Sequence, residues 1–139
     1  MPTLTGVRTQ VELGVTVPNE PGRLAGLTAA LSSAGVNLSG VMTVHAGATA
    51  RVKLLASDEA ASARAQDALE DLGLEVVRTD VFSLEGPAES GLAQRVISRL
   101  ASVGVNIVSC YSQDVDGVTR FVIAVDRPDL ASELLAEPA

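Results

Sequence analysis

The 139-residue sequence is poor in aromatic side chains, with two phenylalanines, one tyrosine and no tryptophan. Proteins that bind single-stranded RNA or DNA commonly stack bases on aromatic residues, so this scarcity argues against such a partner. Basic residues are also outnumbered, because ten lysines and arginines face 17 aspartates and glutamates and give a formal net charge of −7. Binding to a phosphate backbone draws on positive charge, and we therefore expect no nucleic-acid partner.

The sequence also lacks the features of secreted and membrane proteins. Cys110 is its single cysteine, so no disulfide can form within the chain, which fits a reducing compartment. No basic segment followed by an apolar one stands at the start, and we expect no signal peptide. No apolar run approaches the about 20 residues that a membrane-spanning helix needs. These absences predict a cytoplasmic protein that does not enter a membrane.

An internal repeat organises what the sequence does have. Gly35-Val36-Asn37 recurs as Gly104-Val105-Asn106, an offset of 69 residues, and the same offset pairs Gly22 with Gly91. Apolar residues make up 47% of the chain, enough for a buried core that must be aliphatic. A repeat of this length sets the architecture, so we expect one unit of structure to be used twice.

The first copy begins with a predicted strand and helix. Apolar and polar residues alternate over residues 11–17, as in a half-buried strand. Pro21 is expected to open the helix, with Asn19 or Glu20 near its cap. Gly35 is expected to end the helix, because glycine readily takes the left-handed conformation that follows a helical C-terminus.

A hairpin and a second helix complete the first copy. Two alternating strands lie on either side of a turn expected at Ala46-Gly47. Ser57 is expected to cap the next helix and Gly73 to end it, before a last strand that begins at Leu74. This β-α-β-β-α-β order is that of a ferredoxin-like module, an α+β fold with an antiparallel sheet and both helices on one face.

The second copy repeats the pattern but is shorter. Its first strand is expected around residues 81–84, its hairpin turns at Asp116-Gly117, and Asp126 is expected to cap a short helix that starts at Pro128. We expect the copy to be truncated before its last strand, and the N-terminal stretch over residues 4–8 or a partner chain to cover the exposed sheet edge. The sequence thus predicts an N-terminal extension (1–10), a first module (11–79) and a second module (80–139), packed side by side.

A strand end, an asparagine-containing Pro-Gly loop and a helix start follow one another in Val17-Pro18-Asn19-Glu20-Pro21-Gly22-Arg23-Leu24. Gly35-Val36-Asn37 then opens the next strand. This ordered and repeated pattern resembles the ACT family, small regulatory modules that bind amino acids. The likeness extends from about Val11 to Leu135 as two tandem modules, the arrangement of free-standing amino-acid-binding members.

The resemblance implies a ligand site in the first module. Asn19 and Asn37 hold the positions of the two asparagines that contact the amino acid in binding members, often across a dimer interface. The backbone amides at the helix start would also face the ligand. These amides lie around Glu20, Gly22, Arg23 and Leu24.

The resemblance implies a second candidate site at Gly91, Leu92 and Asn106. This copy departs from the family pattern, because Ala88 stands where Asn19 does and Ser90 replaces Pro21. A second, equivalent site is therefore a weaker expectation than the first.

The residue types of the first site suit an amino-acid zwitterion. A helix N-terminus attracts a carboxylate, and Gly22 lets a ligand approach the backbone. Glu20 is the candidate partner for the ammonium, and Arg23 for an acidic ligand side chain. Each residue also has a purely structural interpretation, as a tight turn (Gly22), a helix cap (Asn19), a partner for backbone groups (Asn37) or solvated charges (Glu20, Arg23).

No group of residues indicates catalysis, a metal or a cofactor. His45 is the only histidine and is expected to be exposed beside a turn, whereas Cys110 is expected to be a small buried apolar residue within a strand. Asp114 and Asp116 suit a turn better than a calcium site, because the rest of a calcium loop is missing. We therefore expect neither a bound metal nor a cofactor, and no enzyme.

Three functional hypotheses follow. The first is a regulatory homodimer that senses a small amino acid through a change of conformation or assembly. The second is a ligand-free interaction subunit that docks on a metabolic enzyme through a sheet edge. The third is a small enzyme on a ferredoxin-like sheet, which lacks an identifiable acid–base pair.

Overall fold

The computed structural model describes residues 4–136, which form four helices and six strands. The strands are neighbours in the order β2-β3-β1-β4-β6-β5 of one antiparallel sheet, which makes the fold α+β. None of the helices within residues 4–136 is long and apolar enough to cross a membrane. The elements in chain order are β1 (Gly6–Pro18), α1 (Arg23–Ser33), β2 (Leu38–Ala46), β3 (Thr49–Ala56), α2 (Glu59–Asp71), β4 (Val77–Pro87), α3 (Leu92–Ser102), β5 (Ile107–Val115), β6 (Val118–Val125) and α4 (Pro128–Leu135).

The chain divides into two compact units. The first unit is Gln10–Thr79, and the second unit combines residues 4–9 with residues 80–136. Two strands contribute to both units, because β1 and β4 each run across this division.

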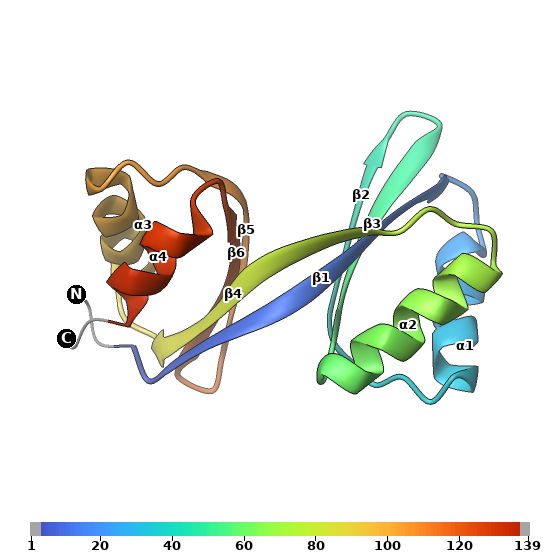
Figure 1. Cartoon of the computed structure of the whole chain (residues 1–139), viewed down its shortest axis with the longest axis horizontal. Coiled ribbons are helices and arrows are strands. Elements are labelled where there is room, and N and C mark those ends of the chain that lie inside the picture. Colours follow the sequence, from blue (N-terminus) through green and yellow to red (C-terminus); the bar gives the residue numbers. More distant parts are fainter. Residues whose placement is uncertain (1–3, 137–139) are drawn as a thin grey trace. The chain divides into compact units, whose positions relative to one another are not determined.

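In the first unit, β3 pairs with β1 on one side and β2 on the other. Leu13, Val15 and Val17 alternate along β1 and are buried against α1 and α2, which lie together on one face of the strands (Figure 1). The period of two places these side chains on a single face, as the sequence predicts. The core also contains Leu27, Leu31, Val36, Ala50, Val52, Leu54, Ala56, Ala61, Ala65 and Leu69.

The second unit has the same local order of elements. β6 pairs with β4 and β5, and α3 and α4 lie together on one face of these strands (Figure 1). Leu92, Val96 and Leu100 follow one another at intervals of four along α3 and are fully buried. This spacing places them on one helical face, which packs against Phe121 and Ile123 of β6 within one core.

The N-terminal stretch belongs to this second unit. The backbone N–H of Thr5 donates to the carbonyl of Glu85 at 2.8 Å, and Leu4 packs against the core of the second unit. Of the two alternatives that the sequence leaves open, the structure therefore shows the N-terminal stretch beside β4.

The predictions of three helix-ending glycines and of the second hairpin turn are confirmed. Gly35, Gly73 and Gly104 follow helices α1, α2 and α3 with φ of 72°, 80° and 83°, a left-handed conformation that suits glycine. At the β5–β6 turn, Asp116 and Gly117 both have positive φ, 51° and 78°, as a tight type I′ hairpin turn requires. The turn between β2 and β3 lies at Gly47-Ala48 and not at Ala46-Gly47 as predicted, because Ala46 still pairs with Thr49.

The predicted helix caps are wrong at three places. α1 starts at Arg23 and not at Pro21, because Gly22 is its cap with φ of 85°, outside the helical region. α2 is capped by Asp58 instead of Ser57, since the Asp58 carboxylate accepts a hydrogen bond from the amide of Ala61 at 2.7 Å.

At α4, Pro128 is the first residue as predicted, but Arg127 holds the cap position and Asp126 does not. The Asp126 carboxylate accepts a hydrogen bond from the backbone N–H of Asn106 at 2.9 Å instead.

Several strand boundaries also differ from the sequence prediction. β1 begins at Gly6, five residues before the alternating run. The strands expected at Leu74 and around residues 81–84 are one continuous strand, β4, which begins at Val77. β5 extends to Val115, so Asp114 lies in a strand, where its carboxylate accepts a hydrogen bond from Thr119 at 2.6 Å.

Candidate functional site

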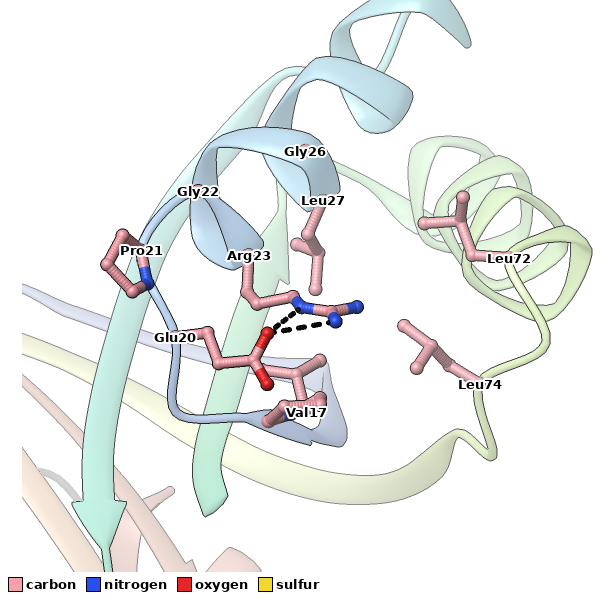
Figure 2. Close-up of a pocket in the computed structure, with 10 residues that line it drawn as sticks. Val17, Glu20, Pro21, Gly22, Arg23, Gly26, Leu27, Leu72 and Leu74 are labelled. Atoms are coloured by element: carbon pink, nitrogen blue, oxygen red, sulfur yellow. Dashed lines mark hydrogen bonds and ion pairs between the residues drawn. The ribbon is translucent and has the colours of Figure 1, made fainter. Parts of the chain in front are cut away.

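A pocket of about 560 Å³ lies in the first unit, where the β1–α1 loop meets the C-terminal end of α2 (Figure 2). This volume is within the range of small-molecule sites. One wall comes from the end of β1, the loop and the first turns of α1, and the other from the segment that follows α2. The lining residues are Val17, Pro18, Glu20, Pro21, Gly22, Arg23, Gly26, Leu27, Leu72 and Leu74.

The loop is shaped by backbone hydrogen bonds. The amide of Glu20 donates to the carbonyl of Pro18 at 3.0 Å, and the amide of Arg23 donates to the carbonyl of Glu20 at 3.3 Å. Gly22 has φ of 85°, and a Cβ built there would meet no atom within 4 Å. The backbone conformation therefore calls for glycine, and the space beside it is left open.

No side chain caps the start of α1. The first amides of a helix have no carbonyl partners within it, and the helix dipole adds a partial positive charge there. The start of α1 is therefore suited to a carboxylate that enters the pocket.

An ion pair lies beside the start of α1. Arg23 donates from Nε and Nη2 to Oε2 of Glu20, at 3.2 and 3.0 Å (Figure 2). The two side chains are 52% and 57% exposed, and exposed pairs of this kind contribute little to stability because water screens them. The pair can therefore open for a ligand at little cost.

Apolar side chains line both walls of the pocket. Val17 and Leu27 are buried in the core, whereas Leu72 at the C-cap of α2 is 50% exposed. Leu74 is partly buried against the same core, and Figure 2 shows Leu72 and Leu74 facing the Arg23 side chain.

Sequence reasoning did not predict Leu72 and Leu74 as site residues. The sequence predicts Leu74 only as the start of a strand, and it assigns no binding role to Leu72 before the helix-ending Gly73. A leucine on either side of Gly73, beyond the last buried residue of α2, was the available signal.

The structure brings together only part of the predicted site. Glu20, Gly22 and Arg23 line the pocket, but Asn19 and Leu24 do not. The Nδ2 of Asn19 donates instead to the carbonyl of Gly47 at 3.1 Å, in the β2–β3 turn.

Asn37 lies at the far end of α1 from the pocket. The helix has 11 residues, and at 1.5 Å per residue it separates the two positions by about 16 Å. The carbonyl of Asn37 accepts a hydrogen bond from the amide of Ser57 at 3.1 Å, and its side chain is exposed. A single chain therefore does not bring Asn19 and Asn37 to the same ligand.

The second candidate site differs from the first. Gly91 caps α3 with φ of 87°, as Gly22 caps α1, but Leu92 is only 1% exposed and packs in the core. Asn106 lies beyond the opposite end of α3, where both its amide and its carbonyl bond to Asp126. The three residues thus do not meet around one ligand.

His45 and Cys110 are not among the residues that line the pocket. His45 is exposed near the end of β2, as predicted. Cys110 is exposed in β5, and its prediction as a buried residue is wrong, although partial burial raises the pKa of its thiol. Among residues 4–136, no three His, Cys, Asp or Glu residues are grouped to hold a metal.

Comparison with known proteins gives structural matches only, since no family model and no curated protein matches the sequence. A protein from Bacteroides thetaiotaomicron is 27% identical, with a TM-score of 0.84 over 93% of this chain and 88% of that one. The ligand-free regulatory subunit of aspartate kinase from Thermus thermophilus is 18% identical, with a TM-score of 0.71 over 95% of each chain. Aspartate kinase from Synechocystis is 21% identical, with a TM-score of 0.64 over 96% of this chain and 26% of that enzyme.

The chain shares its fold with the regulatory subunit of aspartate kinase from Thermus thermophilus. The match to the Thermus thermophilus subunit spans nearly the whole of both chains, so the likeness extends over both units. At 18% identity this likeness concerns the fold alone, because one fold can host unrelated functions.

Proposed function

We propose that the protein is a non-catalytic regulator that binds a small amino acid in the pocket of the first unit. The observation that carries this proposal is the meeting of three features at one place. A helix start without a side-chain cap, an exposed Glu20–Arg23 pair and an apolar wall surround the same space.

Each part of an amino acid finds a matching group there. The start of α1 and the Arg23 guanidinium suit the carboxylate, and the Glu20 carboxylate suits the ammonium. The ligand thereby replaces the ion pair with two new charge pairs. An aliphatic side chain would pack against Leu72 and Leu74, which removes apolar surface from water.

We further propose that the chain consists of two tandem ACT-like modules, residues 11–79 and residues 80–139, after an N-terminal extension over residues 1–10. We also propose that two chains assemble as a homodimer. Asn37 supports the dimer, because it contacts the same ligand as the loop only if a second copy supplies it. Isologous pairing is the commonest way in which identical chains associate.

Binding would act by favouring one conformation or one assembly over another. A ligand shifts such an equilibrium only as far as its affinities for the two states differ. A ligand that bridges the loop of one chain and Asn37 of a second copy binds the dimer alone, which supplies that difference.

A second function is supported by the matches to aspartate kinase regulatory subunits. As a ligand-free subunit, the protein would dock on a metabolic enzyme. β2 and β5 are the outermost strands in the sheet order, so each has one edge without a neighbouring strand among the described residues. Such edges accept a strand from a partner.

The experiment is a thermal-shift screen of the purified protein against the proteinogenic amino acids, one at a time, at millimolar concentration. A ligand at about 100 times its dissociation constant stabilises the folded state by about 2.7 kcal/mol. We expect a shift with one or a few amino acids that is lost in Arg23→Ala. A well-folded sample that shifts with none of them would exclude the sensor and favour the docking subunit.

A further inference from the structure

Helices α1 and α3 occupy equivalent positions in the two copies of the repeat. Each has 11 residues and follows a left-handed glycine, Gly22 in one case and Gly91 in the other. The amide of Gly26 donates to the carbonyl of Gly22 at 2.9 Å, and the amide of Arg95 donates to that of Gly91 at 2.9 Å. Gly26 and Arg95 therefore hold the same place in the first turn of their helices.

In the first unit this place is empty. Gly26 lines the pocket (Figure 2), and a Cβ built on it would meet no atom within 4 Å. Its lack of a side chain leaves the space beside the Glu20–Arg23 pair open.

In the second unit a guanidinium lies against the corresponding loop. Arg95 donates from Nη2 to Oε1 of Glu89 at 2.6 Å and from Nη1 to the carbonyl of Ser90 at 3.4 Å. The same Nη1 is 3.2 Å from the point where a Cβ on Gly91 would stand. The Arg95 side chain thus folds back over the start of α3.

The charges around the two loops are arranged differently as a result. Glu89 corresponds to Glu20 in the repeat, and Leu92 corresponds to Arg23. Leu92 is buried in the core, whereas Arg23 is about half exposed. Arg95, which pairs with the loop carboxylate of the second unit, therefore comes from the position that Gly26 leaves open in the first.

We propose that this position decides which unit binds the amino acid. Gly26 admits the ligand, so that Glu20 is available to its ammonium. Arg95 supplies the second unit with a cation of its own, which pairs with Glu89 and covers the start of α3. Each chain then binds one amino acid, in the first unit. This inference rests on the proposed function.

The test transfers the arginine to the first unit. Gly26→Arg is compared with wild type and with Ala29→Arg, which adds the same charge to an exposed position of α1 outside the pocket lining. Both new arginines are tolerated by a helix better than glycine is, and the unfolding temperature of each variant without ligand verifies that it folds. Binding is measured by calorimetric titration with each amino acid that shifts wild type.

We expect one equivalent bound per chain in wild type and in Ala29→Arg, and an affinity reduced at least about tenfold in Gly26→Arg. Two equivalents per chain in wild type, or unchanged affinity in a folded Gly26→Arg, would overturn the inference while the proposed function stands. If no amino acid binds to wild type at all, the proposed function fails, and the inference fails with it.

Discussion

Asn19 is tied to the β2–β3 turn through Gly47. Its side-chain Nδ2 donates to the carbonyl of Gly47 at 3.1 Å, and its backbone amide donates to the carbonyl of Ala48 at 2.9 Å. Two hydrogen bonds from one residue thus join the loop before α1 to a turn far along the chain. The residue that the family resemblance implies as a ligand contact therefore holds the loop in shape within the chain.

Replacement of Asn19 tests this structural role. We expect Asn19→Ala to lower the free energy of unfolding by about 1 kcal/mol, the usual value for one hydrogen bond. Asn37→Ala should change it by less than about 0.5 kcal/mol, because exposed side chains without partners contribute little. Urea denaturation of both variants measures the difference. Equal losses in the two variants would mean that the Asn19–Gly47 hydrogen bond contributes nothing.

The start of α2 allows the effects of substituting two neighbouring residues, Ser57 and Asp58, to be compared. Asp58 accepts a hydrogen bond from the amide of Ala61, and Ser57 caps nothing within α2. We expect Asp58→Ala to reduce the free energy of unfolding by about 1 kcal/mol, as is typical for a lost N-cap.

Ser57→Ala is the matched control, because the backbone hydrogen bond from Ser57 to Asn37 survives the substitution. Thermal unfolding of the two variants distinguishes them. A larger loss in Ser57→Ala would restore the serine as the cap that the sequence first indicates.

Substitutions of Leu69 and Leu72 distinguish the contribution of core packing to stability from the contribution of the pocket to binding. Leu69 is fully buried, so Leu69→Ala should cost about 2–5 kcal/mol of stability through the cavity it leaves. Leu72 is 50% exposed and lines the pocket, so Leu72→Ala should cost less than about 1 kcal/mol because little buried surface is lost. The same variant should weaken binding of an aliphatic amino acid. Denaturation and ligand titration of both variants measure these effects. Unchanged binding by Leu72→Ala would show that Leu72 does not contact the ligand.

The thiol of Cys110 gives a pH-dependent prediction. Burial disfavours the thiolate and raises the pKa of Cys110 in the folded protein. Alkylation by iodoacetamide should therefore reach half of its maximal rate at a higher pH in the folded chain than in urea, since the thiolate is the nucleophile.

The same pKa shift affects stability with a definite sign. The unfolded chain releases the thiol proton at lower pH than the folded chain does, so the free energy of unfolding should fall as pH rises through the ordinary thiol pKa. Cys110→Ser should remove this part of the pH dependence. A labelling profile identical in the folded and unfolded states would contradict the shift.

Predictions from single residues are confirmed where the residue type strongly favours one backbone conformation. The glycines at 35, 73 and 104 end helices, and Asp116-Gly117 makes the hairpin turn. Predicted helix starts are wrong where neighbouring residues can both serve as the cap. Ser57 and Asp58 are such a pair, since serine and aspartate side chains can each accept a hydrogen bond from the first amides of a helix. The prediction that Cys110 is buried is wrong for another reason. Burial depends on what covers a strand and not on the residue type alone.

The candidate site was predicted in part. Glu20, Gly22 and Arg23 are close in sequence and meet in one loop, so their grouping could be predicted. Leu72 and Leu74 were not predicted, because their place beside α1 depends on how α2 ends against it. The sequence pattern alone also says nothing of the direction that Arg95 takes.

By itself, the sequence determined the repeat, the alternation of strands and helices, the helix-ending glycines and the loop with Glu20 and Arg23. All of these depend on backbone conformation and on side-chain periodicity over a few residues. Only the tertiary structure decided that Leu4 and Thr5 join the second unit, that Leu72 and Leu74 complete the pocket of the first, and that Arg95 covers the loop where Gly26 leaves space. Those relationships are contacts between side chains and backbone brought together by packing, and no local preference specifies them.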